Sequence, residues 1–378
     1  MPKKTNSAKT AGQKSGQKSG PKSGIVIQAQ ELTAFVTALF QHTGTESATA
    51  ETVAQHLVMA NLKGHDSHGV GMIPNYLRNI AAGLLDQNAG IKTIRDNGAI
   101  IMLDGQAGFG QRVGKEATAL AIARAKETGI VCLGLRNAHH LGRIGTYGEQ
   151  CAAAGMVSTH YVNVVGHAPQ VAPFGGREAR LVTNPYCAVV PREDGPPIVL
   201  DMATSAVALG KVRVAYHQGE PVPEGALVDH EGQPTRDPAV MFSEPQGSLG
   251  PFGGHKGYGL AVICELLGGA LAGEWTVQPA HPRSHNIINN MLLFVLDPAA
   301  TGNAHGFQTE VSAMVEYLQN CPPAQGQERV RVPGQPERES LALREAEGIP
   351  IDSGSWSAIC RAAIKAGFAE TNLPQALD

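Results

Sequence analysis

The segment GHDSHGVG at residues 64–71 holds two histidines, an aspartate and a serine in four consecutive positions between glycines. As metal ligands, His65 and His68 would lie three residues apart without the glutamate of H-E-x-x-H, and as a nucleophile Ser67 would lack the G-x-S-x-G elbow. As an acid–base pair, one histidine would exchange a proton with a substrate while Ser67 holds it in place. The structural alternative is that Asp66 and Ser67 only cap the following helix.

Three later stretches add groups that suit acid–base chemistry on a carboxylic acid. In NAHHLGRIG, His140 offers a proton donor and Arg143 a guanidinium that can bind a carboxylate through two hydrogen bonds. In VLDMATS, Asp201 ends a predicted strand, where it would either orient an imidazole or cap the next helix. In GPFGGHKGYG, His255 and Lys256 follow glycines at the start of a predicted helix. This position favours a phosphate or ribose site, with a flexible connector as the alternative.

A dinucleotide-binding protein usually carries G-x-G-x-x-G between a strand and a helix. The segment GFGQRVG at residues 108–114 comes closest, but its last glycine is one residue late. We therefore expect that any NAD is bound without a Rossmann fingerprint.

Charge and cysteine content exclude several classes of protein. Residues 1–24 carry six lysines and no acid, so the remaining chain has 24 basic against 33 acidic residues, a net charge of −9. A nucleic-acid groove needs clustered positive charge, so we expect no nucleic-acid partner. No apolar run is long enough for a membrane partner. The cysteines lie far apart without a C-x-x-C pair, which favours free thiols in a reducing cytoplasm and no metal; they are Cys132, Cys151, Cys187, Cys264, Cys321 and Cys360.

The pattern of apolar residues predicts an α/β protein with a tail and three further parts. Residues 1–24 repeat KSG and contain almost nothing to bury, which predicts a disordered tail. Residues 25–97 show helical spacing and are expected to form an N-terminal helical domain. Residues 98–307 alternate strands with helices, which predicts a central nucleotide-binding domain. Residues 308–378 return to helical spacing and are expected to pack on the N-terminal domain.

Within the central part, AIIMLDG, EATALAIARAKETG and IVCLGLRN predict a strand, a helix and a second strand in a crossover unit. A helix is expected to begin near Thr204 or Ser205. The apolar run YGLAVICELLGGALAG at 258–273 is interrupted by Glu265 and predicts a buried helix.

Several motifs together resemble the malate/L-lactate dehydrogenase family that lacks a Rossmann domain. They are GHDSHGVGMIPNY, NAHHLGRIG, APFGG, TNPYCAVVP, IVLDMATSAVALGK and GGHKGYGLAVICELLGGAL. The resemblance implies a homodimer with a fold peculiar to this family, in which the nucleotide lies on the sheet domain and the substrate between domains. It also implies an oxidoreductase that moves hydride between NAD(H), with NADP as the alternative, and a 2-oxo or 2-hydroxy carboxylic acid. Aromatic acids such as hydroxyphenylpyruvate are among the expected substrates, and malate, lactate, sulfolactate, ureidoglycolate and cyclic-imine carboxylates are the alternatives.

The resemblance also implies roles for single residues. Ser67, His68 and Asp201 match a catalytic relay, and His140 matches a proton acceptor. The glycine-rich segment around Lys256 makes this residue an expected cofactor contact. The resemblance implies the further cofactor contacts His68, Gly142, Arg143, Ile144, Val199, Leu200, Asp201, Met202, Ala203, His255, Asn289, Gly334, Gln335, Pro336 and Glu337. Pro336 departs from the family pattern, because it replaces a bulkier residue.

A second departure concerns the substrate carboxylate. Several branches of the family carry an arginine four residues after the histidine of the first motif, where this chain has Met72. We hypothesise that Arg143 binds the substrate carboxylate instead. Two other classes stay open: a Ser-His-Asp hydrolase with Ser67 as nucleophile, and a non-catalytic binding module attached through its lysine-rich tail.

Overall fold

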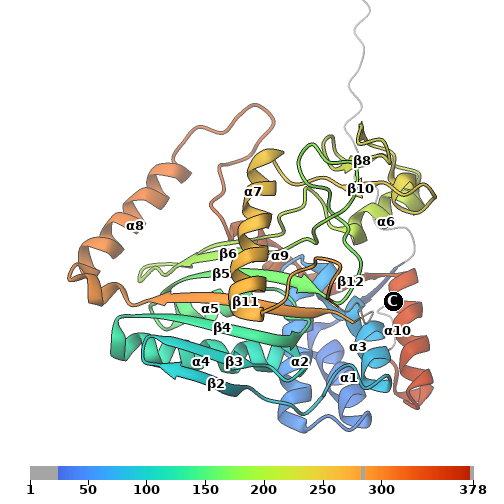
Figure 1. Cartoon of the computed structure of the whole chain (residues 1–378), viewed down its shortest axis with the longest axis horizontal. Helices are drawn as coiled ribbons and strands as arrows, with labels where there is room; N and C mark the ends of the chain where they lie inside the picture. Colours follow the sequence, from blue (N-terminus) through green and yellow to red (C-terminus); the bar gives the residue numbers. More distant parts are fainter. Residues whose placement is uncertain (1–23, 282–285, 375–378) are drawn as a thin grey trace, which may run out of the picture.

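A computed structural model describes residues 24–281 and 286–374. The tail predicted at residues 1–24 therefore lies outside the described residues, except for Gly24, which begins the first strand. The described part contains a helical lobe, a central mixed sheet and a small lobe of short strands (Figure 1). The predicted α/β class is confirmed.

The helical lobe contains both ends of the described chain. Helices with one apolar stripe bury it against a common core, and here that core takes side chains from the first three helices and the last one. In Figure 1 the blue helices α1, α2 and α3 lie next to the red α10. The first and last strands pair antiparallel beside them. These elements are β1 (Gly24–Ile27), α1 (Ala29–His42), α2 (Ser47–Leu62), α3 (Ile73–Ala81), β12 (Ile349–Asp352) and α10 (Ser353–Lys365).

The central sheet has the strand order β2-β3-β4-β11-β5-β6-β7. Of its pairings in the described residues, only that between β3 and β4 is parallel. This pair and the helix between them form the crossover unit that the sequence predicts. The strands are β2 (Lys92–Asn97), β3 (Ile100–Asp104), β4 (Ile130–His139), β5 (Val157–Val165), β6 (Tyr186–Val190), β7 (Ile198–Met202) and β11 (Ile288–Leu296).

Different helices cover the two faces of this sheet. On one face, α4 (Gly110–Thr128) and α5 (Gly145–Ala153) contribute to a large apolar core with the strands. On the other, α7 (His255–Cys264) runs into η4 (Glu265–Gly273), which packs closely on β5 and β11. The close approach depends on glycine, because a Cβ at Gly268 would lie 2.7 Å from the carbonyl oxygen of Tyr161.

The small lobe has an apolar core of its own, to which Ala261 of α7 contributes. Its short strands lie at one end of the central sheet, near the label of α6 in Figure 1. Two further helices follow β11. Helix α8 faces the end of β6 and the start of β7 across a slot, and α9 leads back to the helical lobe. These elements are α6 (Leu209–Gln218), β8 (Leu227–Val228), β9 (Pro234–Thr235), β10 (Ser248–Leu249), α8 (Ala304–Gln319) and α9 (Gln335–Glu347).

Three local expectations differ from the structure. The helix expected near Thr204 begins only at Leu209, because the Thr204 hydroxyl and amide bind the carbonyl of Thr183. The run 258–273 is helical but only half-buried, since Leu271 in it is 61% exposed. Helix α8, in the part expected to pack on the N-terminal domain, lies instead against β6 and β7. Within the described residues, no helix is long and apolar enough to cross a membrane.

Gly110 gives a test of how the fold positions the histidine segment. A Cβ at this residue would lie 2.5 Å from the carbonyl oxygen of His139 and 2.2 Å from that of His140. Gly110→Ala should therefore lower the free energy of unfolding by about 1–3 kcal/mol and reduce activity, because backbone must shift. Gly259→Ala in α7 is the control, since nothing lies within 4 Å of its added Cβ. Thermal melts and turnover that are equal for the two variants would contradict this interpretation.

Candidate active site

The turn that carries His68 is wrapped around the side chain of Asn61. The amide oxygen of Asn61 accepts a hydrogen bond from the Val70 amide at 2.8 Å, and its nitrogen donates to the Asp66 carboxylate at 2.7 Å. Gly69 makes this possible, because a Cβ there would lie 2.1 Å from the same amide oxygen. The end of α2 therefore fixes the backbone on both sides of His68.

A C-terminal helix holds the same turn from outside. Arg344 of α9 binds the two carboxylate oxygens of Asp66 at 2.7 and 3.1 Å. The expected capping role is wrong for Asp66 and Ser67, since neither side chain caps the short helices or α3 that follow. Ser67 is exposed, and within the described residues its hydroxyl makes no hydrogen bond with a histidine. Asp66 is thus an anchor between two distant segments.

His140 lies just after β4, with a defined orientation. The Tyr76 hydroxyl is 2.7 Å from its Nδ1, and the Gln111 amide nitrogen donates to the same hydroxyl at 2.8 Å. Because the tyrosine oxygen accepts from Gln111, its own proton is directed at His140. The neutral His140 ring therefore carries its hydrogen on Nε2, on the side away from Tyr76.

The structure brings His68 and His140 together, with ring centroids 5.7 Å apart. Burial lowers the pKa of His68 to about 4, although the Asp201 carboxylate raises it; His65 and Arg143 lower it further. Burial and the neighbouring His68 also lower the pKa of His140 well below its ordinary value. Both rings are therefore neutral at pH 7. The Nδ1 of His68 is free of a hydrogen-bond partner within the described residues and can take part in proton transfer, whereas His140 presents its Nε2 hydrogen because Tyr76 binds its Nδ1.

Arg143 lies behind this pair with no exposed side-chain surface. Its guanidinium is 3.0 Å from Glu149 and 3.6 Å from Asp201. Lys63 is 2.5 Å from the same Glu149 oxygen, and Asp201 also accepts a hydrogen bond from the Gly145 amide at 2.8 Å. In this arrangement no surface of Arg143 is open to a substrate. Its role as a carboxylate ligand remains a prediction that the geometry does not favour.

Several predicted cofactor contacts come from segments that lie far apart in the sequence. The Val199 amide binds the Pro333 carbonyl at 3.2 Å, and a Cβ at Gly334 would lie 3.1 Å from the Val199 side chain. The Asn289 side chain accepts from the Leu141 amide at 2.8 Å, just before the predicted contacts at residues 142–144. The structure therefore joins β7, the start of α9 and the loop after β4.

Two other predicted contacts have a different setting. His255 and Lys256 form the first turn of α7 and are exposed, after two glycines with positive φ. The ring of His255 lies 5.9 Å from that of Phe174. Within the described residues, His255 makes this aromatic contact and makes no ring contact with His68 or His140.

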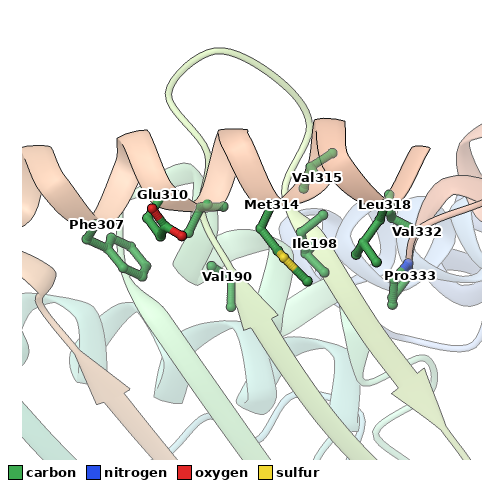
Figure 2. A pocket seen from close by; sticks show the side chains of 10 residues that line it. Val190, Ile198, Phe307, Glu310, Met314, Val315, Leu318, Val332 and Pro333 are labelled. Atoms are coloured by element: carbon green, nitrogen blue, oxygen red, sulfur yellow. The ribbon is translucent and has the colours of Figure 1, made fainter. Parts of the chain in front are cut away.

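An apolar slot of about 410 Å³ adjoins the meeting point of β7 and α9. Figure 2 shows side chains of α8 pointing down toward the strands, with Met314 over Ile198 and Glu310 beside Phe307. Val332 and Pro333 close the slot next to Gly334. Glu310 is the single charged side chain among its described lining residues.

Sequence reasoning missed the residues that orient His140. Tyr76 is fully buried in an apolar core, so its position in the sequence indicates packing only. Gln111 lies in GFGQRVG, the segment that resembles a nucleotide fingerprint, and its role depends on a contact 35 residues away. His56, whose Nε2 accepts from the Arg143 amide at 3.0 Å, lies inside an ordinary helical pattern. None of the three carries a local signal.

The site and the fold together define a class of protein. A pair of neutral, half-buried histidines, backed by a carboxylate, lies where a helical lobe meets a mixed sheet, and this arrangement is suited to proton transfer in an enzyme. The sequence profile of the malate/L-lactate dehydrogenase family matches residues 27–360. The chain therefore belongs to this family and is an oxidoreductase, as the resemblance predicts.

Individual relatives cover nearly the whole chain. The protein is 47% identical over 347 residues to hydroxycarboxylate dehydrogenase B of Escherichia coli strain K12, covering 91% of this chain and 95% of the relative. It is 44% identical over 308 residues to an L-lactate dehydrogenase of Cupriavidus necator, covering 81% and 88%. The solved structure of a sulfolactate dehydrogenase from Methanocaldococcus jannaschii matches with a TM-score of 0.80 at 30% identity, covering 92% and 99%.

The Asp66–Arg344 pair provides a test of how the His68 turn is held. Because Asp66 is half-exposed, Arg344→Ala should lower the free energy of unfolding by only about 1 kcal/mol. Activity should fall by more than stability suggests, since His68 lies two residues from the lost contact. Arg124→Ala, which removes a two-bond pair with Asp96 on β2, should leave kcat/KM unchanged. Equal kcat/KM for wild type and Arg344→Ala would show that the turn does not need its C-terminal anchor.

Proposed function

We propose that this protein is a nicotinamide-dependent 2-hydroxycarboxylate dehydrogenase, with NADH as cofactor and NADPH as the alternative. The observation that carries the proposal is the pair formed by His68 and His140, close together and neutral, with Asp201 acting on one ring and Tyr76 orienting the other. Such a pair can bind and exchange the proton at the C2 oxygen of a hydroxy acid. Proposed substrates include aromatic 2-oxo acids.

The residues present fit a dinucleotide. The slot under α8 has the apolar lining that an adenine ring requires, and it lies beside Gly334 and Val199. The glycine-flanked first turn of α7, with Lys256, suits a phosphate group. The buried Nδ1 of His68 lacks a hydrogen-bond partner within the described residues, as expected where a ligand completes the site. When bound, the cofactor supplies or accepts the hydride.

The two histidines have separable tasks in this proposal. His140 donates its Nε2 hydrogen to the C2 oxygen, because Tyr76 occupies its other nitrogen. His68 exchanges the proton, because Asp201 stabilises the charged form of this ring. Arg143, whose guanidinium lies 3.6 Å from the Asp201 carboxylate, holds this carboxylate in place as a positioning residue.

The alternatives differ in how well they fit. Malate, lactate, sulfolactate, ureidoglycolate and cyclic-imine carboxylates require the same chemistry, and relatives named for several of these substrates match the chain. A Ser-His-Asp hydrolase is not favoured, since Ser67 is exposed and makes no hydrogen bond with a histidine in the described part of the chain.

We also propose a homodimer in the cytoplasm. Large apolar side chains remain exposed on η4 and on α8 outside the slot, which suits a second copy of the chain; they are Leu266, Leu271 and Tyr317. All six cysteines are free thiols, which suits a reducing compartment.

The proposed activity is tested by following nicotinamide absorbance with NADH and NADPH against a panel of 2-oxo acids, including hydroxyphenylpyruvate. We expect oxidation of NADH with at least one member. His68→Asn should lower kcat by about 100-fold or more, the usual contribution of a positioned acid–base group. No absorbance change with any member, together with labelling of Ser67 by a serine-directed acylating reagent, would favour the hydrolase.

The lowered pKa of His68 predicts opposite pH trends in the two directions. Reduction needs the charged ring, so its kcat/KM should rise as pH falls from 8 toward 5, whereas oxidation needs the neutral ring and should be flat over this range. Asp201→Asn removes the charge that raises the pKa of His68, so reduction at a given pH should become slower. Asp96→Asn on β2 should leave both profiles unchanged. If Asp201→Asn also leaves them unchanged, His68 is not the transferring group.

A further inference from the structure

A cavity of about 600 Å³ lies between α3 and the small lobe. Asn75 and Arg78 line it from one face of α3, and Leu209, Ser248 and His167 line it from the opposite side. A cavity of this size has room for an aromatic side chain, because pockets for drug-sized ligands range over about 300–1,000 Å³. We call it the α3 cavity.

Several lining residues of the α3 cavity connect it to the histidine pair. Arg78 lies two residues after Tyr76 on α3, and the Tyr76 hydroxyl is 2.7 Å from His140. His167 is close enough to His140 for its charge to lower the pKa of that ring. On the far side, Leu209 precedes Gly210, where a Cβ would lie 4.0 Å from the Cβ of Ser67. The α3 cavity is thus linked to His140 through its lining residue His167, and to the segment that carries His68 through the neighbour of its lining residue Leu209.

Charge is sparse in the α3 cavity. Arg78 is the only arginine or lysine among its described lining residues, and Glu178 is the only carboxylate. Glu178 is paired with Arg180 at 2.5 Å. The Arg78 guanidinium donates to the Asn75 side chain one turn earlier and is exposed, so most of its five donors remain available. Arg143, by contrast, has no exposed side-chain surface.

We propose that Arg78 binds the C1 carboxylate of the substrate and that the α3 cavity selects monocarboxylic 2-oxo acids with a bulky uncharged side chain. The proposal rests on the proposed function of the same site. A guanidinium binds a carboxylate through two parallel hydrogen bonds, which fixes the orientation of the acid, and Asn75 limits the rotamers of Arg78. Arg78 is the single exposed arginine or lysine in the described lining. A second acidic group on the substrate would therefore lose hydration without gaining an ion pair, which weakens its binding.

The experiment compares Arg78→Gln and Arg78→Lys with wild type, with Arg361→Gln on the exposed face of α10 as the matched control. With phenylpyruvate and NADH, Arg78→Gln should raise KM by about 10- to 100-fold with a much smaller change in kcat, because the bond is made before and during reaction. The KM of Arg78→Lys should lie between those of wild type and Arg78→Gln, because lysine keeps the charge but cannot form two parallel hydrogen bonds. Arg361→Gln should match wild type.

Two further measurements separate carboxylate binding from a general structural defect. Phenylacetaldehyde lacks the carboxylate, so its kcat/KM should be the same in wild type and Arg78→Gln, while that of phenylpyruvate falls. Calorimetric binding of oxamate, an unreactive carboxylate, to the NADH-loaded protein should weaken by the same factor as KM. The melting temperature of Arg78→Gln should equal that of wild type, because the exposed Arg78 side chain donates its hydrogen bond to Asn75 of the same helix.

The outcomes distinguish this proposal from the proposed function. Wild-type turnover of 2-oxo acids with an unchanged KM and oxamate affinity in Arg78→Gln would overturn the role of Arg78 alone. Faster wild-type turnover of oxaloacetate than of phenylpyruvate would overturn the proposed substrate class. Absence of wild-type activity toward the whole panel would instead overturn the proposed function.

Discussion

The burial of one permanent charge, that of Arg143, constrains the architecture of the site. A guanidinium stays charged at every accessible pH, so covering it requires carboxylates close by. Glu149 and Asp201 meet this need from different elements, and Lys63 shares Glu149 from the helical lobe. Removing one partner from such a group leaves an unpaired buried charge, which costs about 3–5 kcal/mol. The cluster therefore ties the helical lobe to the sheet beside the pair formed by His68 and His140.

The same burial sets the chemistry of the histidine pair. His68, His139 and His140 lie in contact with one another or with shared neighbours, and loss of hydration lowers the pKa of each. Asp201 is the one carboxylate that acts against this effect at His68. The residue that neutralises Arg143 thus also adjusts a histidine, so stability and proton affinity depend on a single side chain.

The two arginines near the site illustrate how burial separates structure from recognition. Arg143 follows a histidine motif and has the residue type of a carboxylate ligand, but the protein has already supplied its carboxylates. Arg78 lies in an ordinary helical stretch, and its position beside the α3 cavity leaves donors open. Sequence motifs identify the residue types, whereas accessibility decides which of them can meet a ligand.

Local sequence was sufficient for the elements and the family. Apolar spacing predicted the α/β class and the crossover unit, because side-chain period follows directly from backbone geometry. Motif order predicted the family, which the profile match over residues 27–360 confirms. The roles of His68, His140 and Asp201 were named from the same motifs, and they remain proposals supported by the ring contact and the charge of Asp201.

Only the tertiary structure decided which groups meet. Tyr76 reaches His140 across 64 residues, Gln111 reaches Tyr76 across 35, and Arg344 reaches Asp66 across 278. No local pattern marks such contacts. The tertiary structure likewise decided that the Arg143 side chain is buried and that the Arg78 side chain is exposed. The physical reason is that hydrogen-bond partners, hydration and charge pairing depend on spatial neighbours. A sequence lists the donors and acceptors of this protein, but the packing of its lobes determines which of them are already occupied.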